Sequence, residues 1–155
     1  MSIRVKLLTF MVALITLLSF CISASASTIG TDVTIKSSVL NQATFNGQII
    51  NNRTYVNLIG LLYCLPYLVN SKAMSFNAET KTLNIYSNDF ASNPTPLLQF
   101  HVGDDFFYAG KEKIKIDTKI LLVNNRIYIP LKPITTYYNL NVTFNQKNKS
   151  ISVTK

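Results

Sequence analysis

Side chains typical of catalytic or metal-binding sites are few and scattered in this sequence. The sequence has one histidine, His101, and one acidic pair, Asp104-Asp105. A copper site built from histidine alone is therefore excluded, and a mixed site would require Cys64 and a methionine to converge on His101. Because His101 alternates with apolar neighbours, we expect it on the solvent face of a strand. The acidic pair follows Gly103, which predicts a turn rather than a metal or acid/base site.

Other catalytic patterns are missing from the sequence. It contains no serine nucleophile elbow, phosphate-binding loop, zinc-ligand spacing or calcium loop. The 7 acidic residues are spread along the chain, which leaves little for paired-carboxylate chemistry. We therefore expect neither catalysis nor a metal or cofactor. The alternative is a small extracytoplasmic enzyme, or an enzyme's accessory subunit, whose site is assembled from scattered residues.

The segment 1–26 has the three-part layout of a secretory signal peptide. Arg4 and Lys6 form a basic start, residues 7–22 are largely apolar, and the small residues at 24–26 suit cleavage after Ala26. The apolar run is shorter than the roughly 20 residues that span a bilayer. We therefore expect a secreted or cell-surface protein without a stable membrane span after cleavage. Retention of the signal as an anchor is the alternative.

Residues 27–155 are then expected to form one domain, and this segment is long enough for a hydrophobic core. Cleavage removes two basic residues and leaves 13 basic and 7 acidic ones, for a formal net charge of +6. Cys64 is the only cysteine left, so no intrachain disulfide can form. Its leucine-rich neighbourhood favours a buried, inert thiol over one that pairs with a second chain. The sequence leaves the oligomeric state open.

The predicted strands and helices are organised around a segment that occurs twice. Residues 51–58, Asn-Asn-Arg-Thr-Tyr-Val-Asn-Leu, return later in the chain as residues 124–131, Asn-Asn-Arg-Ile-Tyr-Ile-Pro-Leu. Asparagine tolerates the left-handed backbone of two-residue hairpin turns, so each copy is predicted to begin with a tight turn and continue as a strand. We call the following residues of the two copies the repeat frame: Asn52, Arg53, Tyr55, Leu58, Asn125, Arg126, Tyr128, Pro130 and Leu131.

Each copy is predicted to lie in a unit with the order hairpin, helix, hairpin. In the first unit, residues 33–87, the dipeptide Asn46-Gly47 predicts a hairpin turn, and leucines at helical spacing after residue 57 predict a helix that Pro66 ends. Alternating residues at 74–86 predict the closing hairpin. The pattern favours an α+β fold of antiparallel hairpins packed on short helices.

The second unit, residues 97–155, repeats this order. Pro130 suits the first turn of a helix, and Pro133 is expected to keep that helix short. Alternation at residues 142–153 predicts the last hairpin. Residues 88–96 are polar and contain two prolines, which predicts a linker between the units.

Arg53 and Arg126 are the only arginines after cleavage, and both belong to the repeat frame. They are either contacts for an anion or a partner, or structural groups that bond carbonyls or a neighbouring turn and lock the hairpin to the helix. The structural role is favoured because both copies keep the arginine while the surrounding charges differ. On this interpretation, Arg126→Ala should lower thermal stability.

The lysines form two groups in the sequence. One interpretation is electrostatic docking to an anionic partner, such as a cell-wall polymer or an envelope protein. The other is that lysines protect an edge strand against pairing with another sheet. Export argues against nucleic acid as the partner. The residues concerned are Lys111, Lys113, Lys115 and Lys119 in one group, and Lys147 and Lys149 in the other.

One family has a similar pattern. Residues 125–132 (Asn-Arg-Ile-Tyr-Ile-Pro-Leu-Lys) and 142–145 (Val-Thr-Phe-Asn) stand where the family has Gly-Arg-Thr-x-[Val/Ile]-Pro-Leu-Arg, a helix and a Val-x-Trp-Asp-like hairpin. The chain thus resembles the copper amine oxidase-like N-terminal domain, or stalk domain, of exported proteins from Gram-positive, spore-forming bacteria. The match is best over residues 97–155 and weaker over residues 33–87.

The departures from the family pattern keep shape and polarity. Asparagine replaces the glycine before each arginine, Phe76 and Phe144 replace tryptophan, Lys132 replaces arginine, and Asn57 replaces the first copy's proline. The resemblance implies strands packed on short helices. It also implies no catalysis, because in amine oxidases this domain is a stalk remote from the active site. We therefore expect an exported, non-catalytic binding or structural module of the cell envelope.

Overall fold

The structure is a computed structural model of the chain, and it describes residues 30–39, 42–65, 68, 74–86 and 95–155. The predicted signal peptide and Pro66 lie outside the described residues, as do residues 88–94 of the predicted linker. The described part of the chain is mostly strand with two short helices, in line with the α+β prediction.

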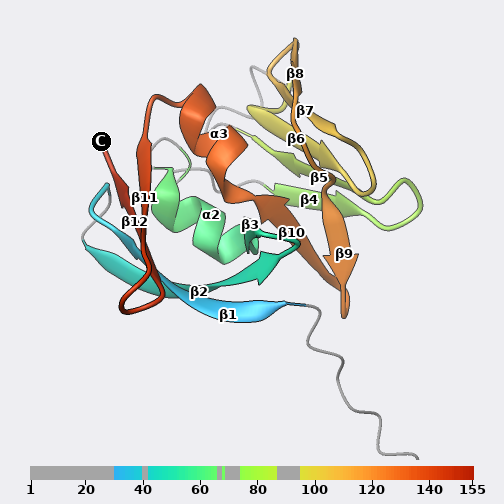
Figure 1. Cartoon of the computed structure of the whole chain (residues 1–155). Helices are drawn as coiled ribbons and strands as arrows, with labels where there is room; N and C mark the ends of the chain where they lie inside the picture. The colour runs from blue at the N-terminus through green and yellow to red at the C-terminus, as the bar shows by residue number, and fades with distance from the viewer. Residues whose placement is uncertain (1–29, 40–41, 66–67, 69–73, 87–94) are drawn as a thin grey trace, which may run out of the picture.

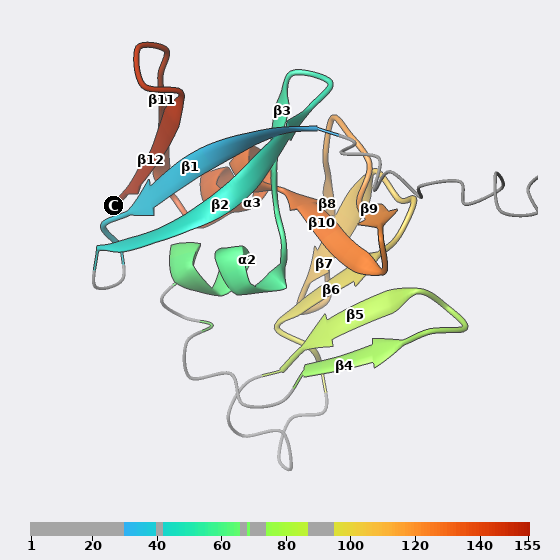
Figure 2. The same cartoon turned by 90° about the horizontal axis from the view of Figure 1, so that it is seen from below.

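The larger sheet has seven strands in the order β11-β12-β1-β2-β3-β10-β9. The paired neighbours are antiparallel except β1 and β12, which run parallel. The sheet curves around the helices (Figures 1 and 2). Its strands are β1 (Thr31–Ser37), β2 (Ala43–Ile50), β3 (Arg53–Val56), β9 (Leu121–Val123), β10 (Arg126–Pro130), β11 (Asn141–Asn145) and β12 (Ser150–Thr154).

The smaller sheet has five antiparallel strands in sequence order. Its inner strands alternate strictly between a buried and a solvent face, as the alternating residues predict; Leu83, Ile85, Leu98, Phe100 and Phe107 point inward. β4 and β8 are its two edges. The strands are β4 (Met74–Asn77), β5 (Thr82–Ile85), β6 (Leu98–His101), β7 (Phe106–Ala109) and β8 (Glu112–Lys115).

Two seven-residue helices, α2 (Leu58–Cys64) and α3 (Leu131–Tyr137), lie on the concave side of the larger sheet (Figures 1 and 2). Leu61, Leu131 and Ile134 are fully buried from the helices and join one core with the inward residues of both sheets. No helix in the described residues is long and apolar enough to cross a membrane.

The two helices begin differently although both follow the repeat frame. Asn57 caps α2 with its side-chain oxygen, which accepts a hydrogen bond from the Gly60 backbone N–H at 2.9 Å. Pro130 takes the corresponding place before α3 and makes no side-chain cap bond. The departure at Asn57 from the family's proline therefore replaces a fixed backbone angle with a capping hydrogen bond.

The helix α3 is short, with seven residues, as predicted, although Pro133 does not end it. Pro133 is the third residue of that helix, which continues to Tyr137, and the helix is as long as α2. The N–H groups of the first helical turn have no intrahelical acceptor, so a proline there removes nothing that the helix needs.

The predicted turn at Asn46-Gly47 is wrong. Both residues lie inside the continuous strand β2, where Gly47 is opposite Val33 of β1, and the chain reverses between Ser37 and Ala43 instead. A Cβ at position 47 would lie 2.5 Å from Ile35 Cδ1 and 2.8 Å from the Tyr55 carbonyl oxygen. Glycine is needed here for close approach, not for a turn.

Both predicted Asn-Asn turns are confirmed. The φ angles are 48° and 60° at Asn51 and Asn52, and 49° and 59° at Asn124 and Asn125. Two successive left-handed residues are the mark of the type I′ turn that joins tightly paired strands. These turns connect β2 to β3 and β9 to β10.

The predicted internal repeat is not confirmed as a repeat of the fold. The order hairpin, helix, hairpin does occur twice along the chain. The closing hairpins nevertheless join different sheets: β4–β5 lies in the five-stranded sheet, whereas β11–β12 lies in the seven-stranded one.

Candidate functional site

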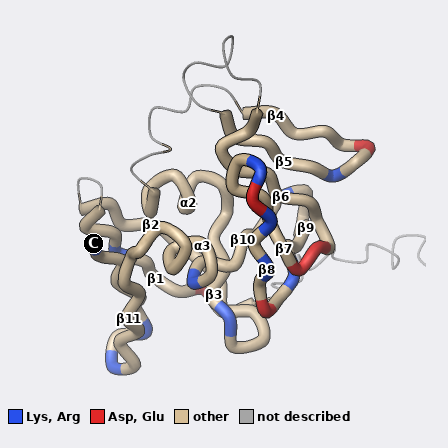
Figure 3. The backbone as a smooth tube through the Cα atoms, turned by 90° about the horizontal axis from the view of Figure 1, so that it is seen from above, with Lys and Arg blue, Asp and Glu red and all other residues tan. Residues whose placement is uncertain are grey.

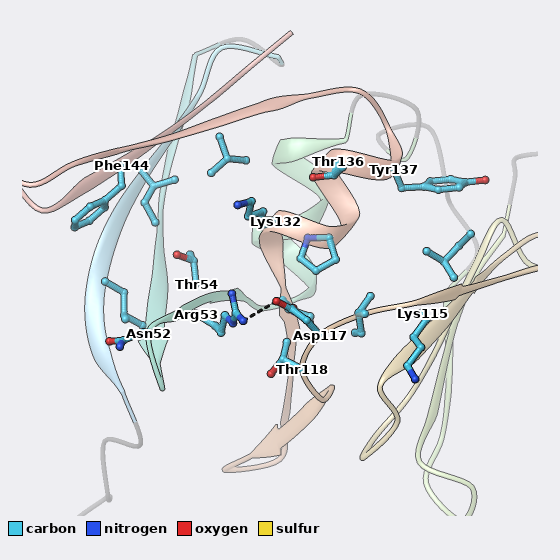
Figure 4. A pocket seen from close by; sticks show the side chains of 17 residues that line it. Asn52, Arg53, Thr54, Lys115, Asp117, Thr118, Lys132, Thr136, Tyr137 and Phe144 are labelled. Carbon is cyan, nitrogen blue, oxygen red and sulfur yellow. Dashed lines mark ion pairs between the residues drawn. The ribbon is translucent and has the colours of Figure 1, made fainter.

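An open groove of about 900 Å³ runs beside α3 (Figure 4). Its walls come from the β2–β3 hairpin, the segment that follows β8, the start of α3 and the β11–β12 hairpin. Its apolar lining includes Ile49, Ile114, Ile116, Pro130, Pro133, Val142, Phe144 and Ile151, and its polar lining includes Asn52, Arg53, Thr54, Asp117, Thr118, Lys132 and Thr136. The groove thus combines an apolar surface with a few polar groups, as ligand sites do.

One wall of the groove is fixed by residues of the first repeat frame. Arg53 Nη2 lies 2.6 Å from Asp117 Oδ2. The Tyr55 hydroxyl donates to the Lys119 carbonyl oxygen at 3.1 Å and lies 2.6 Å from Thr118 Oγ1. Arg53 and Tyr55 are two positions apart on β3 and therefore share a face, as the alternation predicts. Together they hold residues 117–119 against β3, and we call this set of contacts the β3 clamp.

The two contacts of the β3 clamp differ in strength. The side chains of Arg53 and Asp117 are 47% and 55% exposed, so water screens their attraction and the pair is worth under about 1 kcal/mol. Tyr55 is 2% exposed, and its hydroxyl would lose water without gaining a partner if these bonds were absent. Tyr55 is therefore the stronger anchor.

Lys132 is the cation that remains available in the groove. It is exposed, follows the first residue of α3, and makes no ion pair with any described residue. Figure 4 shows its side chain in the groove with Thr54, Arg53 and Phe144 around it, whereas Lys115 points away. With Arg53 matched by Asp117, Lys132 is the unmatched cation on α3. Lys115 is also part of the groove lining but points away from it.

The groove also contains an exposed aromatic ring. Phe144 is 51% exposed on the edge strand β11, and its cross-strand partner Ile151 is also part of the lining. Tyr137 borders the opposite end, where Figure 4 shows it pointing away from Lys132. Its hydroxyl donates to Glu112 Oε2 at 3.2 Å; burial and this hydrogen bond raise the pKa of Tyr137.

The second repeat frame is placed differently from the first. Leu131 of the second frame is fully buried, whereas Leu58 of the first frame is only partly buried. Pro130 of the second frame contributes to the groove lining. Tyr128 is partly buried, and Arg126 is exposed and makes no ion pair with any described residue. Among the described residues Arg126 therefore has no locking contact, and Arg53 contacts the Asp117 carboxylate, whereas the sequence suggests carbonyls or a neighbouring turn as partners.

The predicted lysine contacts do not form one surface. Figure 3 shows the lysines of the β11–β12 turn well apart from those near β8, with β3 and α3 between them. β8 is an edge strand, which fits the protective role, and Lys113 Nζ lies 3.7 Å from the centre of the Phe106 ring. The exposed residues are Lys111, Lys113, Lys115 and Lys119 around β8, and Lys147 and Lys149 in the turn.

The remaining candidates for chemistry are not brought together. His101 is exposed at the end of β6, with Nδ1 3.1 Å from Asp104 Oδ1 in the turn that follows. Cys64 is fully buried, and burial raises the pKa of its thiol to about 12. Within the described residues, no three His, Cys, Asp or Glu side chains group to hold a metal. The one histidine of the chain does not fit a copper centre.

The family comparison covers most of the described structure. The family model for the copper amine oxidase N-terminal domain matches residues 34–153. The chain belongs to this family, as its sequence pattern predicts. In the family this domain is a non-catalytic stalk. No curated protein matches the chain. No solved structure matches it either.

The sequence does not assign several of the groove residues to a site. Asp117 and Thr118 carry no pattern of their own, because their partners Arg53 and Tyr55 are far away in the sequence. Lys132 and Phe144 have a usable signal. Both replace a characteristic residue of the family pattern, and in the structure both line the same groove.

Proposed function

We propose that this chain is an exported, non-catalytic binding module of the cell envelope and that the groove beside α3 is its binding surface. Membership of a family whose domain is a stalk supports the non-catalytic part of this proposal. The signal-like layout of the segment 1–26 supports export.

The observation that carries the proposal is the presence of Lys132 and Phe144 in the lining of the same groove. A lysine without an ion-pair partner and a half-exposed phenylalanine both gain from a ligand, the first by charge neutralisation and the second by loss of contact with water. Both belong to regular elements, α3 and β11, whose backbones are fixed by hydrogen bonds. The β3 clamp fixes the facing wall, so the groove needs little ordering before it binds.

Co-sedimentation with cell walls tests the binding part. The exported, processed protein would be mixed with purified Gram-positive walls, before and after extraction of their anionic polymers, over a series of salt concentrations. We expect binding that weakens as salt screens Lys132 and that falls in Lys132→Met and Phe144→Leu. Lys36→Met and Phe76→Leu are the matched controls, since they change an exposed lysine and an exposed phenylalanine outside the groove.

Failure to bind walls, membranes or any envelope protein would refute the envelope role. Wall binding that the groove variants leave unchanged would refute the assignment to the groove. Export is tested separately: the full chain is expressed in a Gram-positive host, and mass spectrometry of the extracellular and wall fractions should find a protein that begins at Ser27. A chain found only inside the cell would contradict export.

A further inference from the structure

We propose that the groove binds an acidic saccharide, meaning a sugar ring that carries one carboxylate, with the carboxylate at Lys132 and the ring against Phe144. This inference rests on the proposed binding function and specifies the class of ligand.

The charge of the groove fits a ligand with one negative charge per bound unit. Arg53 is already matched by Asp117 at 2.6 Å, which leaves Lys132 as the unmatched charge that points into the groove. Lys115 also lines the groove but points away. A phosphate monoester carries about −1.5 to −2 at pH 7, which is more negative charge than the single lysine that points into the groove can neutralise. A carboxylate carries one charge and is the better match.

The exposed ring of Phe144 favours a ligand that has a flat, partly apolar group. A sugar ring has a face of C–H groups that covers an aromatic ring while its hydroxyls stay on the periphery. Phe144 is paired with Ile151 across β11 and β12, and Val142, two residues before Phe144, lies on the same face of β11, so the ring stands on an apolar surface. A charged ligand without a ring would leave Phe144 in water.

The polar side chains of the groove suit the hydroxyls of a saccharide. Asn52, Thr54 and Thr136 line the groove, and none of their side chains hydrogen-bonds another described residue. Hydroxyl and amide groups both donate and accept, as sugar hydroxyls do. Asn52 and Thr54 flank Arg53 on the β2–β3 hairpin, whereas Thr136 lies one turn after Lys132 on α3. The polar groups therefore approach a ligand from both walls.

A comparison of three small probes separates the charge from the ring. Trigalacturonate has both, its methyl ester keeps the rings without the charge, and triglutamate keeps the charges without the rings. In calorimetric titrations of the processed protein at low salt, we expect trigalacturonate to bind at least about tenfold more tightly than either of the others. Tighter binding of triglutamate would identify an acidic peptide as the occupant and overturn the proposal, and so would equal binding of the methyl ester.

Variants of the two key residues assign the binding to the groove. Lys132→Met should weaken trigalacturonate binding about tenfold or more and leave the methyl ester unaffected, and Phe144→Leu should weaken both saccharides. Lys36→Met and Phe76→Leu should bind as the unmodified protein does, and circular dichroism would verify that each variant is folded. Trigalacturonate binding that survives both groove substitutions would overturn the proposal.

The two proposals fail in different ways. If walls bind through Lys132 and Phe144 but trigalacturonate does not, the acidic-saccharide assignment is wrong and the binding function stands. If trigalacturonate binds through the groove while walls and envelope proteins do not, the ligand class stands and the envelope role is wrong.

Discussion

Val56 and Ile129 lie directly opposite each other on the antiparallel strands β3 and β10. They are equivalent positions of the two Asn-Asn-Arg-x-Tyr segments, which are far apart in the sequence, and both are fully buried. Each copy of the segment thus pairs with the other copy inside the larger sheet, one strand from its β9 edge. The pairing of these two β-branched residues joins the two halves of the chain.

This pairing relates the two segments locally, and the relation does not extend to the contacts around them. The first frame anchors residues 117–119 through Arg53 and Tyr55. Arg126 of the second frame has no corresponding carboxylate among the described residues. What both copies share in the structure is the left-handed Asn-Asn turn and the helix that begins at the frame's leucine.

The left-handed turn before β10 gives the first prediction. Asn125→Ala should lower the free energy of unfolding by about 1 kcal/mol, because φ is 59° and an alanine Cβ is strained in that conformation. Asn125→Gly restores the residue that is usual in the family, and its free energy of unfolding should be at least as high as that of Asn125→Ala. Urea denaturation followed by circular dichroism measures both. An alanine variant as stable as the unmodified protein would contradict the turn geometry.

The second prediction concerns Gly47 and its neighbour. Gly47→Ala should destabilise the protein by about 1–3 kcal/mol, because the added methyl meets Ile35 and the Tyr55 backbone at 2.5 and 2.8 Å. Asn46→Ala is the control, since Asn46 is an exposed strand residue and should change stability by less than about 0.5 kcal/mol. Equal losses in the two variants would instead indicate that the dipeptide acts as a turn.

The error at Gly47 shows why local patterns predicted some elements and not others. The dipeptides Asn51-Asn52 and Asn124-Asn125 join strands that pair with each other, so the local preference and the sheet agree. Asn46-Gly47 has an equally strong local preference, but β2 must continue through it to pair with the whole of β1. Packing against Ile35 then decides the conformation, and no local pattern contains that information.

The same distinction applies to the groove. The sequence predicts that Arg53 and Tyr55 share a face of a strand, because alternation is local. It does not predict that Asp117, Thr118 and Lys119 meet this face, because that contact depends on how the two sheets are joined. Similarly, proximity in the sequence groups the lysines around β8, whereas Lys132 reaches the groove from the first turn of α3.

The third prediction tests the β3 clamp. Tyr55→Phe removes a buried hydroxyl together with its bonds to Lys119 and Thr118, and should cost about 1–2 kcal/mol of unfolding free energy. Tyr128→Phe, at the equivalent position of the second frame, should cost less than about 0.5 kcal/mol.

The arginines of the two frames extend this test. Arg53→Ala should cost under about 1 kcal/mol and become neutral in high salt, because its ion pair with Asp117 is half exposed. Arg126→Ala should be nearly neutral, which replaces the loss of stability that the sequence alone predicts. Thermal and urea denaturation of the two tyrosine and two arginine variants measures these losses of stability. A larger loss of unfolding free energy at Tyr128 than at Tyr55, or at Arg126 than at Arg53, would contradict the role of the β3 clamp.

The last prediction uses the buried thiol of Cys64. Burial raises its pKa from 9.0 to about 12, because the thiolate would be poorly solvated in the core. Below pH 9 the folded and unfolded states both hold the proton, and Cys64 gives no pH dependence. Between pH 9 and 12 the unfolded state releases this proton while the folded state keeps it. Stability should therefore fall as pH rises, approaching about 1.4 kcal/mol per pH unit from this group.

Cys64→Ala isolates this contribution, because the tyrosines that titrate in the same range remain in both proteins. The variant should be less stable at pH 8, where it loses buried contacts, and should lose less stability between pH 9 and 11 than the unmodified protein. Urea denaturation at each pH gives both slopes. In the processed protein, a thiol reagent should react with Cys64 only at the rate of unfolding, since the thiol has no exposed surface. Equal slopes, or rapid labelling of the folded protein, would show that Cys64 is reached by water and does not belong to the core.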